Sequence, residues 1–336
     1  SGQTFSAHTN KDGSTIEYYG NNFASFAWGT DYENLIFSEG ISGDFVSSEL
    51  NVLKNTTIAN GTGNDISLKG TFTGNIILGE NGINAGSVTL TSSAQINVSG
   101  NCANLSINGN LAVNNALSSG GIISVTGTTS ATGAISAQGN ISFGGNADVA
   151  EVTSTSGAIS FDGDATATGT ISASGDITFG GNANIYEVTS QNGAISVTGT
   201  TSANGNITSA KSQTFNGAFT LQNDITFVAS KVEFKGKVDS KAGSNYSATF
   251  GNETVKTSAA FHFSVGSSVP LGNITLNDAS FSENASLIQM ESSSLNVNGQ
   301  VKFGKAQLQL GNLNISASGN FTQTGINTDS QSVGTI

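Results

Sequence analysis

Two aspartates that flank a glycine are the residues best suited by type to do chemistry. Asp162 and Asp164 stand in the segment FDGDAT, with Asp148 and Asp176 in the neighbouring repeats. Paired carboxylates can hold calcium, or serve as the acid and the base of a polysaccharide-cleaving enzyme. Nothing else in the sequence converges on these acids, and the adjacent repeats lack the pair. We therefore predict no metal site, and keep a polysaccharide-processing β-helix enzyme as an alternative function.

Nucleophilic catalysis needs a histidine that orients and relays protons. The two histidines are His8, near the start of the sequence, and His262, between two phenylalanines, where we interpret it as a packed or edge residue. The single Cys102 forms neither an intramolecular disulfide nor a cysteine-based zinc site, so we predict a buried thiol. The sequence contains no nucleophile elbow, phosphate loop or HExxH motif. We predict a protein with no catalytic residues and no cofactor, which is not an enzyme.

Three further groups of residues are candidates for a binding surface. They are a threonine group (Thr126, Thr128, Thr198, Thr200), a lysine group (Lys231, Lys235, Lys237, Lys241) beside Glu233 and Asp239, and an aromatic group (Tyr18, Tyr19, Trp28, Tyr32). A threonine ladder could bind ice, but Asp162 and Asp164 interrupt it. We interpret the lysines as a charged edge in contact with solvent. We interpret the aromatic group as packing in the core or the cap, and the alternative is an exposed surface that binds carbohydrate. The binding residues stay unknown at this stage.

Composition excludes other classes of function. The chain has 336 residues, a net charge of −12 and only 10% charged residues, and all of its basic residues are Lys. Nucleic-acid binding needs clustered cations, so we predict no nucleic-acid partner. No apolar run reaches the roughly 18 residues that span a bilayer, so we predict no membrane span. The opening SGQTFSAHTNKDG lacks the basic and apolar regions of a signal peptide, so we expect any export signal to lie outside this sequence.

The positions of these residues depend on an internal repeat. Segment 121–154 and segment 157–190 belong to a tandem repeat of 36 residues that matches at 21 positions. Within it, apolar residues recur every 18 positions in two columns: Ile123, Ile141, Ile159, Ile177 and Ile195, then Val125, Phe143, Phe161, Phe179, Val197 and Phe215. Alternation of buried and exposed residues with period two predicts strands.

Glycine recurs every six residues through much of the repeat, which predicts three short strands per coil joined by glycine corners. We expect these corners to use the positive φ that glycine tolerates. Upstream, Ile66 to Cys102 keep the six-residue spacing but lie three residues out of phase with Leu105 and Leu111. The pattern therefore predicts a change of half a corner-to-corner step near 102–105.

Stacked columns of this kind are typical of a parallel β-helix, a solenoid in which each coil pairs with its neighbours. We predict an all-β, right-handed parallel β-helix with about 18 residues per coil. Left-handed winding is less favoured, because left-handed hexapeptide repeats place glycine directly after the aliphatic residue. The predicted organisation is an N-terminal cap at 1–50, a regular β-helix at 51–228, irregular coils or an insertion at 229–272, and C-terminal coils at 273–336.

The columns, the Gly-x-Ile-Ser-x-x-Gly repeats and the surface rich in Asn, Ser and Thr resemble a known class. The chain resembles the passenger region of a bacterial autotransporter or a filamentous-haemagglutinin-type exoprotein, over most of 50–325. The stretch SFSENASLIQMESSSLNVNGQVKFGKAQLQLGNLNISASGNFT is similar in texture to vacuolating-cytotoxin-like passengers of epsilon-proteobacteria. This resemblance implies export across the outer membrane and display at the bacterial cell surface.

Together these observations predict a secreted, surface-displayed, non-catalytic adhesin. Its expected partners are a host cell-surface glycan, matrix or receptor, or the same protein on neighbouring bacteria, with the chain itself a monomer or weakly self-associating. A long series of weak polar contacts can add through avidity. The alternative from the resemblance is a toxin-like module that binds host cells and oligomerises.

Overall fold

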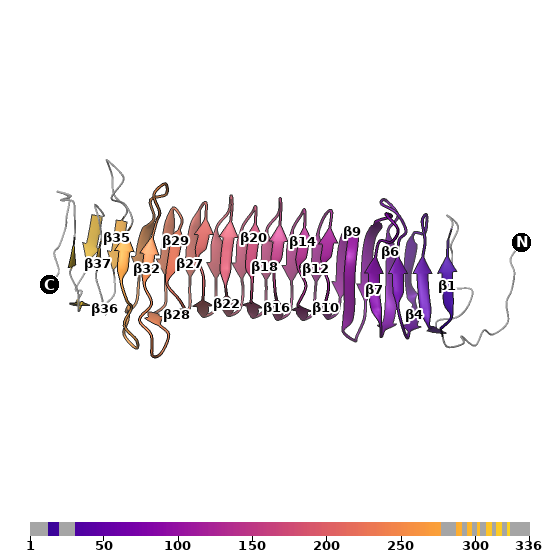
Figure 1. Cartoon of the computed structure of the whole chain (residues 1–336), viewed down its shortest axis with the longest axis horizontal. Helices are drawn as coiled ribbons and strands as arrows, with labels where there is room; N and C mark the ends of the chain where they lie inside the picture. Colours follow the sequence, from indigo (N-terminus) through magenta and orange to yellow (C-terminus); the bar gives the residue numbers. More distant parts are fainter. Residues whose placement is uncertain are drawn as a thin grey trace, which may run out of the picture. The chain divides into compact units, whose positions relative to one another are not determined.

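Every regular element in the described part of the chain is a β-strand. The computed structural model describes residues 13–19 and 31–276 and, for the backbone, six more strands between 287 and 322. The chain divides into two compact units, Ser1–Asp162 and Gly163–Ile336, which we describe separately. In each, successive strands stack as coils (Figure 1).

The described residues of the first unit form eighteen strands, which are short in its regular part. They are β1 (Thr15–Tyr18), β2 (Asp31–Tyr32), β3 (Asn34–Phe37), β4 (Gly43–Val52), β5 (Thr56–Ile58), β6 (Ile66–Phe72), β7 (Asn75–Leu78), β8 (Ala85–Thr91), β9 (Ile96–Asn108), β10 (Leu111–Val113), β11 (Leu117–Ser119), β12 (Ile123–Val125), β13 (Thr129–Ala131), β14 (Ile135–Ala137), β15 (Ile141–Phe143), β16 (Ala147–Val149), β17 (Val152–Ser154) and β18 (Ile159–Phe161).

The second unit continues the same kind of coil and then becomes less regular. Its strands are β19 (Ala165–Ala167), β20 (Thr170–Ala173), β21 (Ile177–Phe179), β22 (Ala183–Ile185), β23 (Glu187–Ser190), β24 (Ile195–Val197), β25 (Thr201–Ala203), β26 (Ile207–Ser209), β27 (Ser212–Phe215), β28 (Phe219–Leu221), β29 (Ile225–Val228), β30 (Lys231–Phe234), β31 (Val238–Ser240), β32 (Ala248–Phe250), β33 (Ser258–Phe261), β34 (Ile274–Leu276), β35 (Leu287–Met290), β36 (Ser294–Val297), β37 (Val301–Lys302), β38 (Gln307–Leu310), β39 (Asn314–Ala317) and β40 (Phe321–Thr322).

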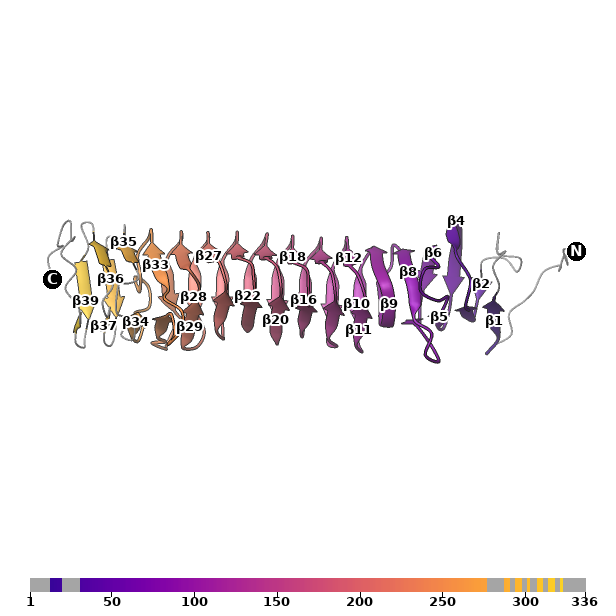
Figure 2. The same cartoon turned by 90° about the horizontal axis from the view of Figure 1, so that it is seen from above.

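Each regular coil has three strands, which define three faces. In the first unit, face A carries β12, β15 and β18, face B carries β10, β13 and β16, and face C carries β11, β14 and β17. In the second unit, face A carries β21, β24, β27 and β30, face B carries β19, β22, β25, β28 and β31, and face C carries β20, β23 and β26 (Figure 2). All of these pairings are parallel. The fold is therefore a parallel β-solenoid, consistent with the predicted right-handed β-helix.

The predicted apolar columns form the core of each unit. Ile123 pairs with Ile141 and Ile141 with Ile159 in the first unit, and Ile177 pairs with Ile195 in the second. Each partner is the next member of the column predicted from the sequence. All five side chains are buried. The register of the columns is confirmed.

Large and small side chains alternate around the coil inside this core. Four residues after buried Phe143 comes buried Ala147, and four after Phe179 comes Ala183, whereas the smaller Val197 is followed at the same distance by Thr201. In these coils a large residue on face A is thus followed by a small one on face B. Farther along the second unit the pattern ends, because buried Phe215 is followed at the same distance by buried Phe219, with ring centroids 4.8 Å apart. Phe143 in turn stacks on Phe161, with ring centroids 5.0 Å apart.

The predicted reason for the corner glycines is wrong. No described glycine between Gly109 and Gly243 has a positive φ. The corners instead bring successive coils into close contact. A Cβ added at Gly145 would lie 2.6 Å from the carbonyl oxygen of Gly127, one coil earlier, and a Cβ at Gly133 would lie 2.3 Å from that of Asn115. These corners use glycine because a side chain has no room.

The predicted change of half a step upstream is found as a loss, which begins before the predicted position at 102–105: two residues are lost between Ile96 and Gly100 and one between Cys102 and Leu105. Leu105 pairs with Ile123 at the regular coil step, whereas Ile96 pairs with Leu111, a step that is three residues shorter. The chain between 96 and 105 is thus three residues short, and it runs as the single long strand β9, in which Gly100 has a positive φ of 102°.

Coils lengthen in the segment predicted to be irregular. Lys231 pairs with Ser258 and Ala248 with Ile274, and both steps are about one and a half times as long as the regular one. In the segment predicted as a cap, the described strands β2 and β3 already pair in parallel with β4 and β5. The domain boundaries themselves stay predictions, and Trp28 and His8 lie outside the described residues.

Candidate functional site

The aspartates that were weighed as an acid pair hold the coils together. Asp164 Oδ1 accepts a hydrogen bond from the backbone N–H of Asn182 at 2.7 Å, and Asp176 Oδ1 accepts one from Ala194 at 2.8 Å. In both cases the donor lies at the same corner of the next coil. Asn182 repeats the arrangement toward Thr200 at 2.9 Å. Asp164 and Asp176 therefore belong to ladders of hydrogen bonds along the corners. At other coils of these ladders an Asn side chain accepts the same hydrogen bond.

The other two aspartates are placed differently. Asp148 lies exposed on face B of the first unit, where it pairs with Ser130, and Asp162 lies exposed at a corner. Among the described residues, no group of three or more His, Cys, Asp or Glu side chains is placed to hold a metal ion.

His262 joins a charged cluster on face A of the second unit. Its Nε2 lies 3.0 Å from Glu233 Oε1, which also accepts a hydrogen bond from Lys231 Nζ at 3.3 Å, while Lys235 Nζ lies 3.8 Å from Glu233 Oε2. Burial alone raises the pKa of Glu233, but the hydrogen bonds from His262 and Lys231 and the charges of both lysines outweigh it, so the pKa lies below its ordinary value. The lysine group of the sequence is thus divided: two members pair with Glu233, and Lys241 lies elsewhere.

Two members of the threonine group lie at corners of the coils, and Cys102 lies in the core. Thr128 and Thr200 lie at corners, where their backbone N–H groups donate to Asn110 and Asn182. They are therefore not part of a flat strand face. Cys102 is buried as predicted, and its burial raises the pKa of the thiol to about 12, although a hydrogen bond from Ser119 opposes the shift.

The described tyrosines of the aromatic group separate into core and surface. Tyr18 and Tyr32 are buried, and their hydroxyl oxygens lie 2.8 Å apart. Burial raises the pKa of Tyr32, and the hydrogen bond with Tyr18 raises it further. Tyr19 is 79% exposed. Core packing is thus the outcome for two of them.

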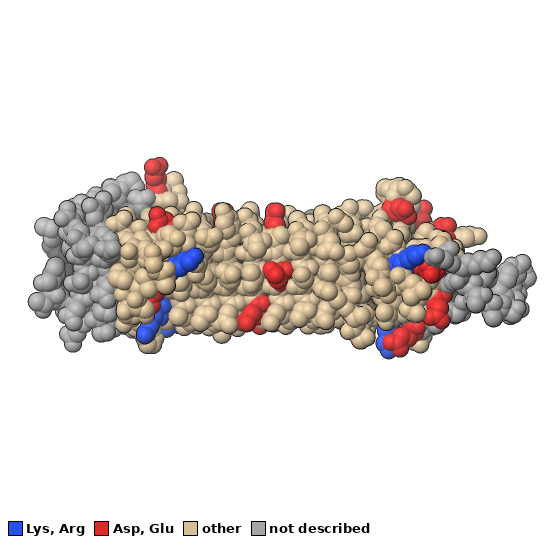
Figure 3. Space-filling view, turned by 60° about the horizontal axis from the view of Figure 1, so that its bottom comes forward, with Lys and Arg blue, Asp and Glu red and all other residues tan. Residues whose placement is uncertain are grey.

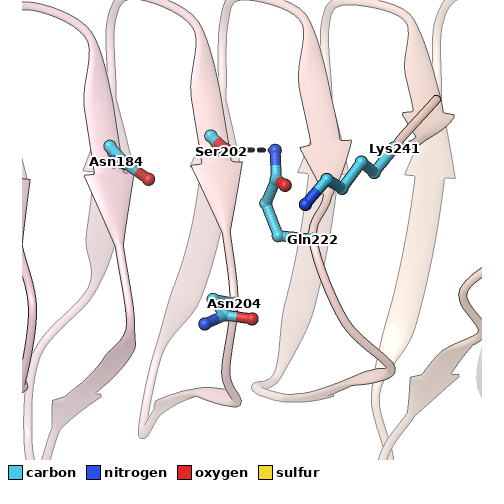
Figure 4. Close-up of a pocket in the computed structure, with 5 residues that line it drawn as sticks. All are labelled: Asn184, Ser202, Asn204, Gln222 and Lys241. Atoms are coloured by element: carbon cyan, nitrogen blue, oxygen red, sulfur yellow. Dashed lines mark hydrogen bonds between the residues drawn. The ribbon is translucent and has the colours of Figure 1, made fainter.

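A polar hollow on the second unit is the best candidate for a binding site. It has a volume of about 500 Å³ and is lined by Asn184, Ser202, Asn204, Gln222 and Lys241. Figure 4 shows these side chains rising from successive coils, with Lys241 reaching back toward Gln222. Gln222 Nε2 donates a hydrogen bond to Ser202 Oγ at 2.7 Å.

Two columns of outward residues build this hollow. Asn184 and Ser202 pair directly at the centres of β22 and β25 on face B. Asn204, Gln222 and Lys241 each follow the last residue of a face B strand, and each donates its backbone N–H to the coil before, namely to Ile185, Ala203 and Leu221 at 2.9, 2.7 and 2.9 Å. They hold the same corner position in three successive coils. The residue at that position one coil earlier is Tyr186, which is 45% exposed. We call Tyr186, Asn204, Gln222 and Lys241 the corner column.

A second hollow lies along the other edge of face B in the same unit. It has a volume of about 450 Å³, shares Asn184 and Ser202 with the first, and is bounded by the corner residues Asp164, Asn182 and Thr200. The outward side chains of face B in this unit thus lie between two shallow hollows. Side-chain amides and hydroxyls line the first, whereas Ala165, Ala183 and Ala218 contribute to the lining of the second.

The electrostatics of the first hollow come from one cation. Lys241 is exposed and forms no ion pair with any residue that the structure describes. Asp239, two residues earlier on β31, uses its Oδ1 to accept hydrogen bonds from the backbone N–H groups of Ser268 and Val269 at 2.9 and 3.3 Å. The ammonium group is therefore available to a ligand.

Sequence reasoning missed the corner column. Its residues share no chemical type, so no single-residue repeat marks them. Their spacing does carry a signal, because Tyr186, Asn204 and Gln222 follow one another at the interval of the core columns. Lys241 comes one residue later than that interval would place it.

Comparisons with known proteins identified no relative of this chain. No protein-family model, no curated protein and no solved structure matches the chain. Among the described residues, no helix has the length and apolar character needed to cross a bilayer.

Proposed function

We propose that this chain is a non-catalytic adhesin, displayed on the bacterial surface as an autotransporter-type passenger, that binds glycans on host cells or on sister bacteria. The observation that carries the proposal is the polar hollow of the second unit, where amide and hydroxyl groups converge beside an exposed aromatic corner. Saccharides present many hydroxyl groups and apolar ring faces, which such a lining recognises through hydrogen bonds and aromatic contact.

Two features support binding without catalysis. The carboxylates of Asp164 and Asp176 accept hydrogen bonds from the backbone of the next coil. Glu233 lies on another face, where His262 and two lysines surround its carboxylate. A general acid needs a raised pKa near its working pH, whereas the pKa of Glu233 is lowered. Repetition of similar polar faces along the coils supports avidity on a surface with many copies of a ligand.

Binding to intact cells tests the proposal. The purified chain, labelled at a surface lysine remote from the hollow, is titrated onto cultured epithelial cells and onto the producing bacterium. We expect saturable binding to at least one of them, reduced after enzymatic removal of surface glycans. Absence of binding to both cell types would refute the adhesin proposal.

The same experiment separates the toxin-like alternative. Cells that bind the chain are followed for vacuoles and for leakage of a small dye. An adhesin leaves the cells intact, whereas vacuoles or leakage would favour an oligomerising toxin-like module over the proposal.

A further inference from the structure

We infer that the corner column of the second unit binds an anionic saccharide, with Lys241 pairing with its carboxylate or sulfate group. This inference deepens the proposed glycan binding and rests on it. The chemistry required is one fixed negative charge on a chain of sugar rings.

The first step is that the fold does not require these side chains. The same corner position in the first unit is held by Asn114, Thr132 and Ala150, and the backbone N–H groups of Thr132 and Ala150 donate to Val113 and Ala131 at 2.9 Å. The ladder therefore forms with small side chains. In the second unit Thr168 holds the position first, and the next four coils carry an aromatic ring, two amides and an ammonium group there, which the backbone contacts do not explain.

The second step concerns unused hydrogen-bonding groups. No hydrogen bond joins the side-chain amides of Asn184 and Asn204 to other residues of the described structure, and both residues are exposed. Gln222 donates one N–H to Ser202, which leaves its Oε1 and its second N–H for a ligand. The lining thus offers both donors and acceptors, as the hydroxyl groups of a sugar require.

The third step is charge. The protein has a net charge of −12, and between Lys69 and Lys211 it has no cation at all. The net charge repels anions at long range, so an anion binds only where a cation is close. The unpaired ammonium group at the polar hollow provides such a place, since a charge-assisted hydrogen bond is stronger than a neutral one. Figure 3 shows how few Lys side chains there are on the face in view.

The fourth step is length. Successive parallel coils are about 4.8 Å apart, so the corner column extends over about 14 Å from Tyr186 to Lys241. A short oligosaccharide extends over a comparable distance. Tyr186 at one end would stack on a ring face, and Lys241 at the other end would bind the acid group. The amides between them bind hydroxyls.

Titration calorimetry with matched oligosaccharides tests the inference. The probes are a hyaluronan tetrasaccharide, which carries carboxylates, its carboxyl-reduced neutral form, and a heparin tetrasaccharide, which adds sulfates. We expect binding to one or both anionic probes that weakens as salt rises, with at least about tenfold weaker binding of the neutral form. The preferred anionic probe identifies the acid group.

Variants then assign the site. Lys241→Gln is expected to weaken binding of the preferred anionic probe about tenfold and to remove most of its salt dependence, and Tyr186→Ala is expected to weaken it by a similar factor. Lys237→Gln is the matched control, because Lys237 is also exposed but does not line the hollow. Unchanged unfolding midpoints show that the variants are folded.

Three results would overturn the inference: no binding of either anionic probe, equal binding of the neutral form, or equal losses in Lys237→Gln and Lys241→Gln. Cell binding keeps the two proposals apart. If Lys241→Gln binds cells as well as the original chain does, the inference is wrong and the adhesin proposal stands. If the original chain binds the probes but no cells, the adhesin proposal is wrong and the site assignment stands.

Discussion

Gln213 is a polar residue inside an apolar column. It pairs with Ile195 on face A of the second unit and is fully buried. Its Nε2 donates to the carbonyl oxygens of Ile207 and Val228 at 2.8 and 3.0 Å, and its Oε1 has no hydrogen-bond partner in the described structure. The side-chain amide thus donates hydrogen bonds to backbone carbonyl groups of face C at the place where the strand register changes. There Ile207 pairs with Phe227, two residues beyond the regular coil step.

Substitution at Gln213 tests this role. Gln213→Glu replaces the donating nitrogen by an oxygen that faces two carbonyl oxygens, so we expect a loss of about 3–5 kcal/mol in the free energy of unfolding at pH 7. Gln213→Met keeps the volume and leaves only unpaired carbonyls, with an expected loss of about 1–3 kcal/mol. Urea unfolding measures both. A glutamate variant as stable as the methionine variant would show that the nitrogen does not donate as described.

At the scale of the element, the Glu233 cluster connects β30 to the residue after β33, across one of the lengthened coil steps. The carboxylate has a lowered pKa in the folded state, so its ionised form contributes stability above the unfolded pKa of about 4.3. That contribution is lost as the pH falls through the pKa of Glu233 in the folded state, which is lower than its pKa in the unfolded chain.

This linkage predicts a difference between two chains. Between pH 7 and pH 3 the original chain loses more stability than Glu233→Gln does, by up to about 1 kcal/mol, because the glutamine cannot be protonated. The measurement is the thermal midpoint of each chain as a function of pH. Parallel curves for the two chains would contradict it.

The corner is the second element whose role can be tested. Gly145→Ala places a Cβ 2.6 Å from a backbone oxygen of the preceding coil, which cannot move without breaking the ladder. We expect a loss of about 1–3 kcal/mol in unfolding free energy. Gly120→Ala is the matched control, because its nearest contact would be an ordinary 3.8 Å. There the loss of unfolded-chain entropy predicts no change or a gain of about 0.5 kcal/mol. Equal behaviour of the two variants would exclude close coil contact as the reason for glycine.

The corners also show what sequence reasoning reached and where it stopped. Ile141 and Ile159 were placed in the core because identical residues recur at the coil length. The recurrence of glycine was equally visible, but a sequence does not tell a positive φ from a close approach, and the wrong reason was chosen. Asp164 was weighed as one of an acid pair, and its ladder role was missed because its partner, the backbone N–H of Asn182, has no sequence signature. The corner column escaped because Tyr, Asn, Gln and Lys form no recognisable motif.

At the scale of the whole molecule, charge is the dominant property. The net charge is −12, and no cation occurs between Lys69 and Lys211 to neutralise the acidic residues of the regular coils. Like charges on two chains repel each other over a Debye length of about 8–10 Å near physiological ionic strength. We therefore expect the chain to resist self-association at low salt.

Light scattering across a salt series measures this. The expected result is a single-chain mass at about 10 mM salt, with weak association, if any, at high salt, where the repulsion is screened. A large assembly at low salt that dissociates as salt rises would contradict the charge argument. It would indicate ionic contacts from the lysines between 231 and 241 instead.

The tandem repeat has an evolutionary consequence. Each 36-residue repeat encodes two whole coils, and strands such as β12 and β15, or β19 and β22, pair at the regular coil step. Unequal recombination between the two gene segments inserts or deletes whole coils, so the ladders and the core columns rejoin in phase. Gene variants that differ in length by whole repeats would encode proteins that still fold. A population that carries this gene can therefore vary the number of coils without a period of selection for a new core.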